Sequence, residues 1–253
     1  MDDIILESQN LRKEFGALVA VAGVNVKVKK NAIHSVIGPN GAGKTTFFNL
    51  LSGTLSPTSG RVIFKGKDIT NLPVHQTIHL GIGRSFQITN LFPNLTALEN
   101  VRLACQALGR DSFRFFQSHK QFRQYEKRAM EVLEEVGLGK RALSPAKTLP
   151  HGDQRKLELA MILAPNPEVL LLDEPTAGMA AEQVPELIEL IKKVHSSGNK
   201  TIVLVEHNMN VVMSISHRIT VMHLGEVLAE GSPAEIAANE TVQKAYLGEL
   251  YSN

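Results

Sequence analysis

The chain has 253 residues, 43% of them apolar, so it can bury a large core and form one domain or one domain with a subdomain. Its 27 basic and 25 acidic residues leave a net charge of only +2, which excludes a general nucleic-acid-binding field. The single cysteine, Cys105, excludes an internal disulfide and is typical of a reducing compartment. The N-terminus lacks a signal-peptide pattern, and no apolar run approaches the ~20 residues of a membrane span, so we expect a cytoplasmic protein.

The first 90 residues consist of short strand patterns around one glycine-rich loop. Residues 4–7, 24–28, 34–37 and 61–64 are short and rich in apolar or β-branched side chains, which is typical of strands. An amphipathic helix is expected over residues 45–51, directly after the loop. This part of the chain therefore predicts an α/β unit.

From residue 91 to residue 164 the pattern becomes helical. Thr96 and Glu99 have the spacing of a capping box and predict a helix start. Apolar side chains recur at helical spacing through residues 121–136, and another helix is expected over residues 156–164. We expect this stretch to form a helical insert.

From residue 165 the α/β pattern returns. Residues 169–172 are continuously apolar, as a strand buried on both faces should be. The elements expected after it are a helix, a second buried strand, a hairpin and a final capped helix, at residues 181–196, 201–205, 219–229 and from Ser232. The sequence thus predicts one domain over residues 1–253, with a core of residues 1–90 and 165–253 and a helical subdomain of residues 91–164.

The glycine-rich loop matches a phosphate-binding motif. Residues 38–46 read Gly-Pro-Asn-Gly-Ala-Gly-Lys-Thr-Thr, which fits G-x-x-x-x-G-K-[ST] between a strand and a helix. Glycines let successive backbone N–H groups converge on phosphate oxygens, and the helix N-terminus adds its dipole. Lys44 is expected to contact the β- and γ-phosphates, and the Thr45 hydroxyl to hold Mg²⁺. The alternative is a glycine-rich turn without a ligand.

Two carboxylates follow the strand at residues 169–172. Asp173 is placed to join the shell of a Mg²⁺ ion beside the phosphate loop. Glu174 can polarise a water molecule for in-line attack on the γ-phosphate. Taken alone, this acidic pair could be a solvated turn, but together with the phosphate loop it indicates a catalytic site.

Two further polar residues stand at informative places. His207 follows the strand at residues 201–205, where it could contact the γ-phosphate, although a lone histidine there would usually be structural. Gln87 lies at the border between the α/β part and the helical insert. From there it could coordinate Mg²⁺ or the attacking water and couple the occupancy of the site to the position of the helical insert.

The order of these motifs over the whole chain resembles that of the ATP-binding subunit of an ABC transporter. In that family an aromatic residue precedes the Walker A loop, and the Q-loop glutamine, the signature, Walker B and the switch histidine follow it. The resemblance implies an ABC ATPase fold, an α/β phosphate-loop NTPase core with a mixed sheet, an N-terminal antiparallel β subdomain and a helical insert. It also implies nucleotide contacts at Phe15, Val21, Asn40, Gly41, Ala42, Gly43, Lys44, Thr45, Thr46, Gln87, Asp173 and His207.

The resemblance also assigns roles within this set. Phe15 is expected to stack on adenine. The implied catalytic residues are Glu174, His207 and Lys44, and the implied Mg²⁺ ligands are Thr45, Gln87 and Asp173. The signature residues expected to face the nucleotide of a partner subunit are Pro150, His151, Gly152 and Asp153.

Within the family the chain is most similar to branched-chain amino-acid importer ATPases. The residues that carry this similarity are Glu-His-Asn-Met at 206–209, Ala-Glu-Gly-Ser-Pro at 229–233, Ala-Tyr-Leu-Gly at 245–248 and the longer insert around 106–128. The similarity implies an ATPase that binds ATP and Mg²⁺ and drives amino-acid uptake. It further implies a second ATPase subunit, transmembrane permease subunits, an indirect link to a solute-binding protein, and a peripheral position on the cytoplasmic face of the membrane.

Two departures from the family pattern affect the expected dimer. The usual signature is Leu-Ser-Gly-Gly-Gln, but Pro150 replaces the serine and His151 the first glycine. Ala180 stands where the loop after Walker B usually carries an aspartate. Since both changes lie where the family's dimer closes, we expect weak homodimer activity and a paralogous partner, with a homodimer as the alternative.

Other interpretations remain open at this stage. A soluble ABC-type ATPase acting on nucleic acid, ribosomes or cofactor assembly is the main alternative function, and an ordinary phosphate-loop kinase is another. Residues 110–128 mix basic and aromatic side chains, which could touch lipid headgroups or nucleic acid, although an amphipathic helix with one face packed inward is favoured. Residues 88–100, next to Gln87, are expected to dock a short helix of the membrane subunit.

Overall fold

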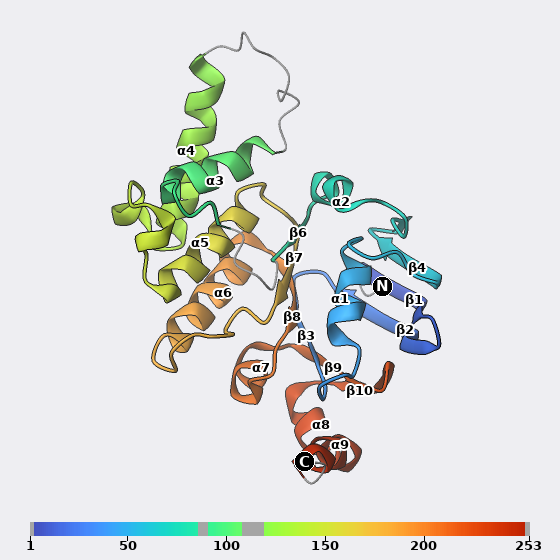
Figure 1. Ribbon diagram of the computed structural model, residues 1–253. Coiled ribbons are helices and arrows are strands. Elements are labelled where there is room, and N and C mark those ends of the chain that lie inside the picture. Colours follow the sequence, from blue (N-terminus) through green and yellow to red (C-terminus); the bar gives the residue numbers. More distant parts are fainter. Residues whose placement is uncertain (1–2, 86–90, 108–118, 251–253) are drawn as a thin grey trace.

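Two β-sheets and a group of helices make up the protein (Figure 1). The structure is a computed structural model that describes residues 3–85, 91–107 and 119–250. In the view of Figure 1 the strands of the larger sheet run through the middle, the antiparallel strands lie at the right, and α3, α4 and α5 lie at the upper left. The predicted mixed sheet, antiparallel sheet and helical region are therefore confirmed.

The smaller sheet is antiparallel and is built mainly by the N-terminal residues. Its strand order is β2-β1-β4-β5. A two-residue turn joins the two long strands, with Phe15 opposite Leu18. The strands are β1 (Ile4–Phe15), β2 (Leu18–Lys29), β4 (Ser59–Phe64) and β5 (Lys67–Asp68).

The larger sheet positions the site. Its order is β10-β9-β3-β8-β7-β6; the five strands from β9 to β6 are parallel, and β10 pairs antiparallel with β9. Successive residues of β7 and β8 alternate between two hydrophobic clusters, one formed with the helices and one with α1 and the smaller sheet. The strands are β3 (Ile33–Ile37), β6 (Ile82–Arg84), β7 (Val169–Asp173), β8 (Thr201–Val205), β9 (Arg218–His223) and β10 (Glu226–Gly231).

The helices pack on both faces of this sheet. Phe47 and Phe48 of α1 are fully buried between the two sheets. On the other face, α5 and α6 cover the sheet, and α3 and α4 pack beyond them. The helices are α1 (Lys44–Leu51), α2 (Val74–Leu80), α3 (Ala97–Gln106), α4 (His119–Glu135), α5 (His151–Leu163), α6 (Val184–Gly198), α7 (Met209–Ile215), α8 (Pro233–Ala237) and α9 (Glu240–Leu250), with short 3₁₀ turns at Gly139–Arg141 and Ala146–Thr148.

Most predicted elements are present, with shifted ends. The predicted caps are confirmed, because the Thr96 hydroxyl accepts from Glu99 N and Ser232 forms a full capping box with Glu235. The helix expected from residue 156 begins at His151, five residues earlier. Helices α2 and α7 were not predicted, and neither was strand β6. The division between core and helical subdomain at residues 90 and 165 stays a prediction.

Cys105 is buried in the core. Among the described residues, no helix is both long and apolar enough to cross a bilayer.

A buried histidine in the larger sheet generates a pH prediction. His34 is 1% exposed, and its Nε2 lies 2.7 Å from the Thr220 hydroxyl. Burial, together with the nearby charge of Arg218, lowers the pKa of His34 from 6.5 to about 4. Because the folded state resists protonation, the stabilisation is complete above pH 6.5 and is lost as the pH falls towards 4.

We therefore expect wild-type protein to lose about 2 kcal/mol more unfolding free energy than His34→Gln between pH 7.5 and pH 5. Glutamine does not titrate and can still reach the threonine hydroxyl. Denaturant titration at the two pH values measures the difference. Equal losses in the two proteins would contradict the assignment.

Candidate nucleotide-binding site

The loop after β3 turns sharply against neighbouring backbone, which explains two of its glycines. A Cβ at Gly38 would lie 2.1 Å from the Met222 carbonyl oxygen, and one at Gly43 would lie 2.3 Å from that of Ala20. Both residues also have positive φ angles, of 152° and 94°. Only glycine fits such close approaches, so the loop is held tightly between the two sheets.

The loop lines a cavity of about 530 Å³ together with residues from distant parts of the chain. Lys44, which is only 5% exposed, points its ammonium at the loop itself and donates to the carbonyl oxygens of Gly38 (2.7 Å) and Pro39 (2.8 Å). The residues that line the cavity are Leu18, Val19, Ala20, Asn40, Gly41, Ala42, Gly43, Lys44, Thr45, Thr46, Glu174, His207 and Leu224. The structure therefore brings the loop, the predicted base and the predicted switch histidine into one cavity.

Glu174 and His207 meet because β7 and β8 are neighbours. Their carboxyl ends lie at the same edge of the sheet, and Asp173 is paired with Val205. His207 Nε2 lies 2.6 Å from Glu174 Oε1. Glu174 has φ +48°, a left-handed conformation that costs a non-glycine residue about 1–2 kcal/mol. Such strain persists only where surrounding contacts hold it, and here Glu174 N donates to the Val205 carbonyl at 2.9 Å.

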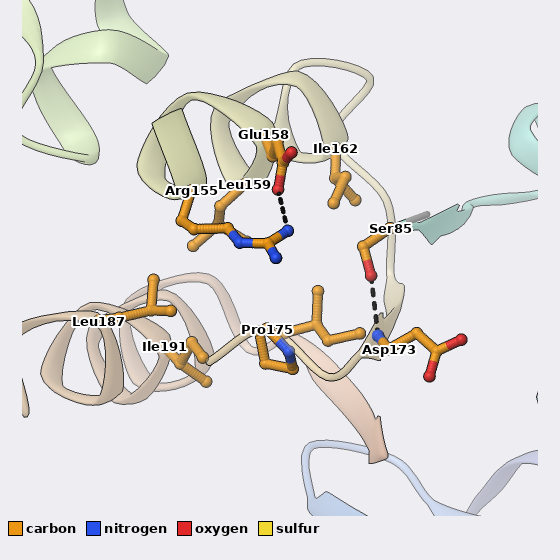
Figure 2. Close-up of a pocket in the computed structure, with 10 residues that line it drawn as sticks. Ser85, Arg155, Glu158, Leu159, Ile162, Asp173, Pro175, Leu187 and Ile191 are labelled. Atoms are coloured by element: carbon orange, nitrogen blue, oxygen red, sulfur yellow. Dashed lines mark hydrogen bonds and ion pairs between the residues drawn. The ribbon is translucent and has the colours of Figure 1, made fainter. Parts of the chain in front are cut away.

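Asp173 has the environment expected of a cation ligand. It is 3% exposed, and its backbone N–H donates to the Ser85 hydroxyl at 2.8 Å (Figure 2). Neither carboxylate oxygen has a hydrogen-bond partner among the described residues, and Arg84 Nη2 is 4.0 Å from Oδ2. Burial raises the pKa of Asp173, although the Arg84 charge opposes this. Burying a carboxylate that accepts no hydrogen bond is costly, and a cation such as Mg²⁺ would offset that cost. The residues present therefore fit such a cation.

Arg84 connects the region around Asp173 to the end of α1. Its guanidinium donates to the side chains of Asn49, Ser52 and Thr54, all at or just after the end of α1. The guanidinium carbon also lies 5.6 Å from the centre of the Phe48 ring. Arg84 therefore ties the end of β6 to the helix that follows the phosphate loop. Nothing in the sequence singled it out.

The residues predicted to contact adenine differ from the residues that line the cavity on the side expected for the adenine ring. Phe15 is half exposed, has the Lys13 ammonium 5.2 Å from its ring centre, and is not among the residues that line the cavity. Val21 is fully buried in the core. The exposed side chains of Leu18 and Leu224 do line the cavity and were missed, because they come from two hairpins whose proximity no local pattern encodes. The roles of Phe15 and Val21 stay predictions.

The signature residues lie away from this chain's own phosphate cavity. Pro150 is the N-cap of α5, and its carbonyl accepts from Gln154 N. A Cβ at Gly152 would lie 3.1 Å from the Gln183 side-chain oxygen, so this turn packs against the segment before α6. Asp153 pairs with Arg141 at 3.2 Å and Lys156 at 3.4 Å. None of the four predicted signature residues, Pro150, His151, Gly152 and Asp153, lines the 530 Å³ cavity.

Helix α5 is linked to the loop after β7 through Arg155, whose contact with Glu158 is drawn in Figure 2. Arg155 Nη1 donates to Glu158 Oε2 at 2.8 Å, and Nη2 donates to the Ala177 carbonyl at 2.9 Å. Arg155 Nε and Glu158 Oε1 have no partner among the described residues, and a cavity of about 20 Å³ lies beside them. That volume is enough for one water molecule.

Two predicted regions fall partly or wholly outside the described residues. Gln87 lies outside them, so its expected contact with Mg²⁺ or water stays a prediction. Of the expected docking segment at residues 88–100, the structure describes residues 91–100. Of the basic and aromatic segment at residues 110–128, it describes the side chains from Arg123 onward, on α4. Among the described residues, no group of three or more His, Cys, Asp or Glu side chains could hold a metal by itself.

Comparison with family models assigns the site to a known family. The model described as ABC transporter matches residues 21–177, from within β2 through the phosphate loop to the turn after Glu174. A second model, described as branched-chain amino acid ATP-binding cassette transporter, matches residues 226–251. The two matches together cover the chain from β2 to the turn after β7 and then β10, α8 and α9, whereas residues 178–225 lie outside both.

Individual relatives agree with these models. The chain is 44% identical over 250 residues to the high-affinity branched-chain amino acid transport ATP-binding protein BraF of Pseudomonas aeruginosa, covering 97% of this chain and 98% of that protein. A solved ADP conformation of an ATP-binding cassette of an ABC transporter has a TM-score of 0.84 and 28% identity, covering 97% and 99% of the two chains. A solved dimeric cassette in a post-hydrolysis state, bound to ADP and Pi, has a TM-score of 0.76 and 30% identity, covering 90% of this chain and 99% of that chain. This chain belongs to the ABC transporter ATP-binding family, whose members are ATPases that power transport.

Proposed function

We propose that this chain is the ATP-hydrolysing subunit of an importer for branched-chain or related amino acids. The observation that carries the proposal is the similarity to a branched-chain amino acid transport ATP-binding protein across nearly the whole chain. The cavity that joins the phosphate loop to Glu174 and His207 supplies the chemistry. The reported relatives are transport proteins, so a soluble ATPase acting on nucleic acid or ribosomes is not favoured.

The proposed chemistry follows from the contacts in the cavity. The nucleotide phosphates would take the place of the carbonyl oxygens that Lys44 Nζ now contacts, because a charged donor prefers phosphate oxygens. Glu174 would accept a hydrogen bond from the attacking water and orient it in line with the γ-phosphate. His207, already 2.6 Å from Glu174, would hold that carboxylate in place and contact the γ-phosphate.

We also propose a Mg²⁺ site at the border of the cavity. Thr45 and Asp173 would hold the ion, with the remaining positions filled by phosphate oxygens and water, and with Gln87 as a further ligand. Bound there, the ion would neutralise charge on the β- and γ-phosphates. The buried oxygens of Asp173, which accept no hydrogen bond from the described residues, support this assignment.

A partner ATPase subunit would complete the nucleotide site. The signature residues of this chain stand apart from its own cavity, as expected if they serve the nucleotide of a second subunit. Because Pro150 offers neither a hydroxyl nor an N–H group, we propose that the partner is a paralogous subunit whose own signature faces Lys44 and Glu174.

We further propose that transmembrane permease subunits dock beside the helical region, which would hold this chain on the cytoplasmic face of the membrane. A groove of about 240 Å³ lies there, lined in part by Gly83, Arg84 and Ser85 at and just after the end of β6. Its lining is mostly apolar, with contributions from α2, α3 and α5, among them Ile78, Ala104, Met161 and Ile162. A short amphipathic helix fits such a groove. The solute-binding protein would contact only the permease.

The proposed function is tested with Lys44→Ala. The lysine serves phosphate binding and the core does not depend on it, so the folded variant should bind ATP far more weakly and support no uptake of labelled leucine when combined with its permease and partner. Lys192→Ala, which removes an exposed lysine paired with Glu189, is the matched control and should behave as wild type. Unchanged ATP affinity in Lys44→Ala would overturn the site assignment, and a wild-type complex that hydrolyses ATP without leucine uptake would overturn the substrate.

Glu174→Gln separates binding from hydrolysis. The amide keeps the shape of the side chain but is a poor acceptor for the proton of the attacking water. We expect near-normal MgATP affinity and at least about a hundredfold lower turnover, with ATP-bound dimers accumulating. A single-turnover assay measures this. Turnover at the wild-type rate would mean that another residue orients the water.

Pro150→Ser tests the hypothesis that the proline in the signature weakens self-association of this chain. Serine restores a hydroxyl and an N–H group, and one charge-assisted hydrogen bond of about 1.5–3 kcal/mol corresponds to roughly ten- to a hundredfold stronger self-association. Pro150→Ala is the control, because it restores the N–H group alone. Sedimentation of each protein with MgATP measures the dimer fraction. A wild-type chain that already dimerises tightly would show that a single hydroxyl does not limit closure.

A further inference from the structure

We propose that Glu206 is a positioning residue that sets the mutual geometry of Glu174 and His207 by bridging the two loops that carry them. Glu206 follows the last residue of β8 and is 3% exposed, although its side chain is a carboxylate. The inference rests on the proposed function, since it assigns a supporting role at the same site.

The two oxygens of Glu206 are used on different loops. Oε1 accepts from the backbone N–H of Thr176 at 3.0 Å and from its hydroxyl at 2.6 Å. Oε2 accepts from His207 N at 3.1 Å and more weakly from Asn208 N at 3.5 Å. One side chain therefore joins the turn after β7 to the start of the segment before α7.

The turn after β7 needs such an anchor. Glu174 is in the left-handed conformation, and its carbonyl accepts from Ala177 N at 3.0 Å to close a four-residue turn. Glu174 N is fixed to the Val205 carbonyl at 2.9 Å and the Ala177 carbonyl to Arg155, whereas the N–H and hydroxyl groups of Thr176, inside the turn, are fixed through Glu206. If that anchor were removed, the turn could relax and carry the Glu174 carboxylate away from His207.

The chemistry of the bridge requires a carboxylate. An ionised carboxylate is an acceptor on both oxygens, so it can serve donors on both loops at once. Glutamine offers one acceptor oxygen, and its NH₂ group would face N–H donors on the other side. Aspartate is one methylene shorter. The bridge is therefore specific to glutamate, which is testable with conservative changes.

The principal test is Glu206→Gln in the full chain, assembled with its partner ATPase and permease. We expect kcat to fall about ten- to a hundredfold, because displacements near 1 Å at a catalytic group have effects of that size. KM for ATP and the affinity for MgATP should be unchanged, because none of the hydrogen bonds that the structure describes for Glu206 reaches the phosphate loop. Glu230→Gln, which removes the charge of a carboxylate that pairs with Arg218 and does not line the cavity, is the matched control and should keep wild-type kcat.

A double-mutant cycle distinguishes positioning from a purely structural role. If Glu206 acts through Glu174, adding Glu206→Gln to Glu174→Gln should lower the residual kcat little further, because residues that act as a unit are non-additive. Effects that multiply fully, or a wild-type kcat in Glu206→Gln, would overturn the inference. Neither result would touch the proposed function, which ATP binding by Lys44→Ala and leucine uptake by the wild-type complex test separately.

If Glu206→Gln does not fold, variants of Thr176 test the same bridge from its other end. Thr176→Val removes the hydroxyl that donates to Oε1 and keeps the shape, while Thr176→Ser keeps the hydroxyl. We expect a several-fold lower kcat for the valine variant at unchanged KM, with the serine variant restoring it. Equal kcat in the valine, serine and wild-type proteins would overturn the inference.

Discussion

The parallel pairing of β3, β8 and β7 is the constraint on which the site depends. These strands are neighbours in the order β3-β8-β7, so their carboxyl ends open onto one edge of the sheet. The phosphate loop leaves β3 there, Glu174 leaves β7 and His207 leaves β8. Residues far apart in sequence are thereby brought to within hydrogen-bonding distance without any direct pattern between them.

The same edge concentrates buried charge. Lys44, Asp173 and Glu206 are each at most 5% exposed, which is rare for charged side chains and costly without partners. Lys44 and Glu206 have close protein partners, whereas the Asp173 oxygens have no hydrogen bond from the described residues. A cation bound as proposed would supply the contacts that these oxygens lack among the described residues.

The sequence predicted what depends on local patterns. The strand–loop–helix order around the glycine-rich loop, the buried strands β7 and β8 and the cap at Ser232 follow from spacing and side-chain type, and the structure confirms them. The order of motifs along the chain indicated the family, which the comparisons confirm.

What the sequence could not predict depends on tertiary contacts. The pairing of Arg84 with the end of α1, the bridge of Glu206 and the approach of Leu224 to the phosphate loop each join segments that are distant in sequence. The early start of α5 at His151 was missed because proline and glycine at the signature are poor helix signals, yet Pro150 serves as the N-cap.

The central claim is that the cavity at this sheet edge binds the phosphates of ATP through Lys44 while Glu174 faces the γ-phosphate. A crystal structure of the chain with Mg²⁺ and a non-hydrolysable ATP analogue tests it most directly. The account predicts that Lys44 Nζ leaves the carbonyls of Gly38 and Pro39 for the β- and γ-phosphate oxygens, with Asp173 close to the metal. An analogue bound elsewhere, or phosphates in the cavity with Lys44 still on the loop carbonyls, would contradict it.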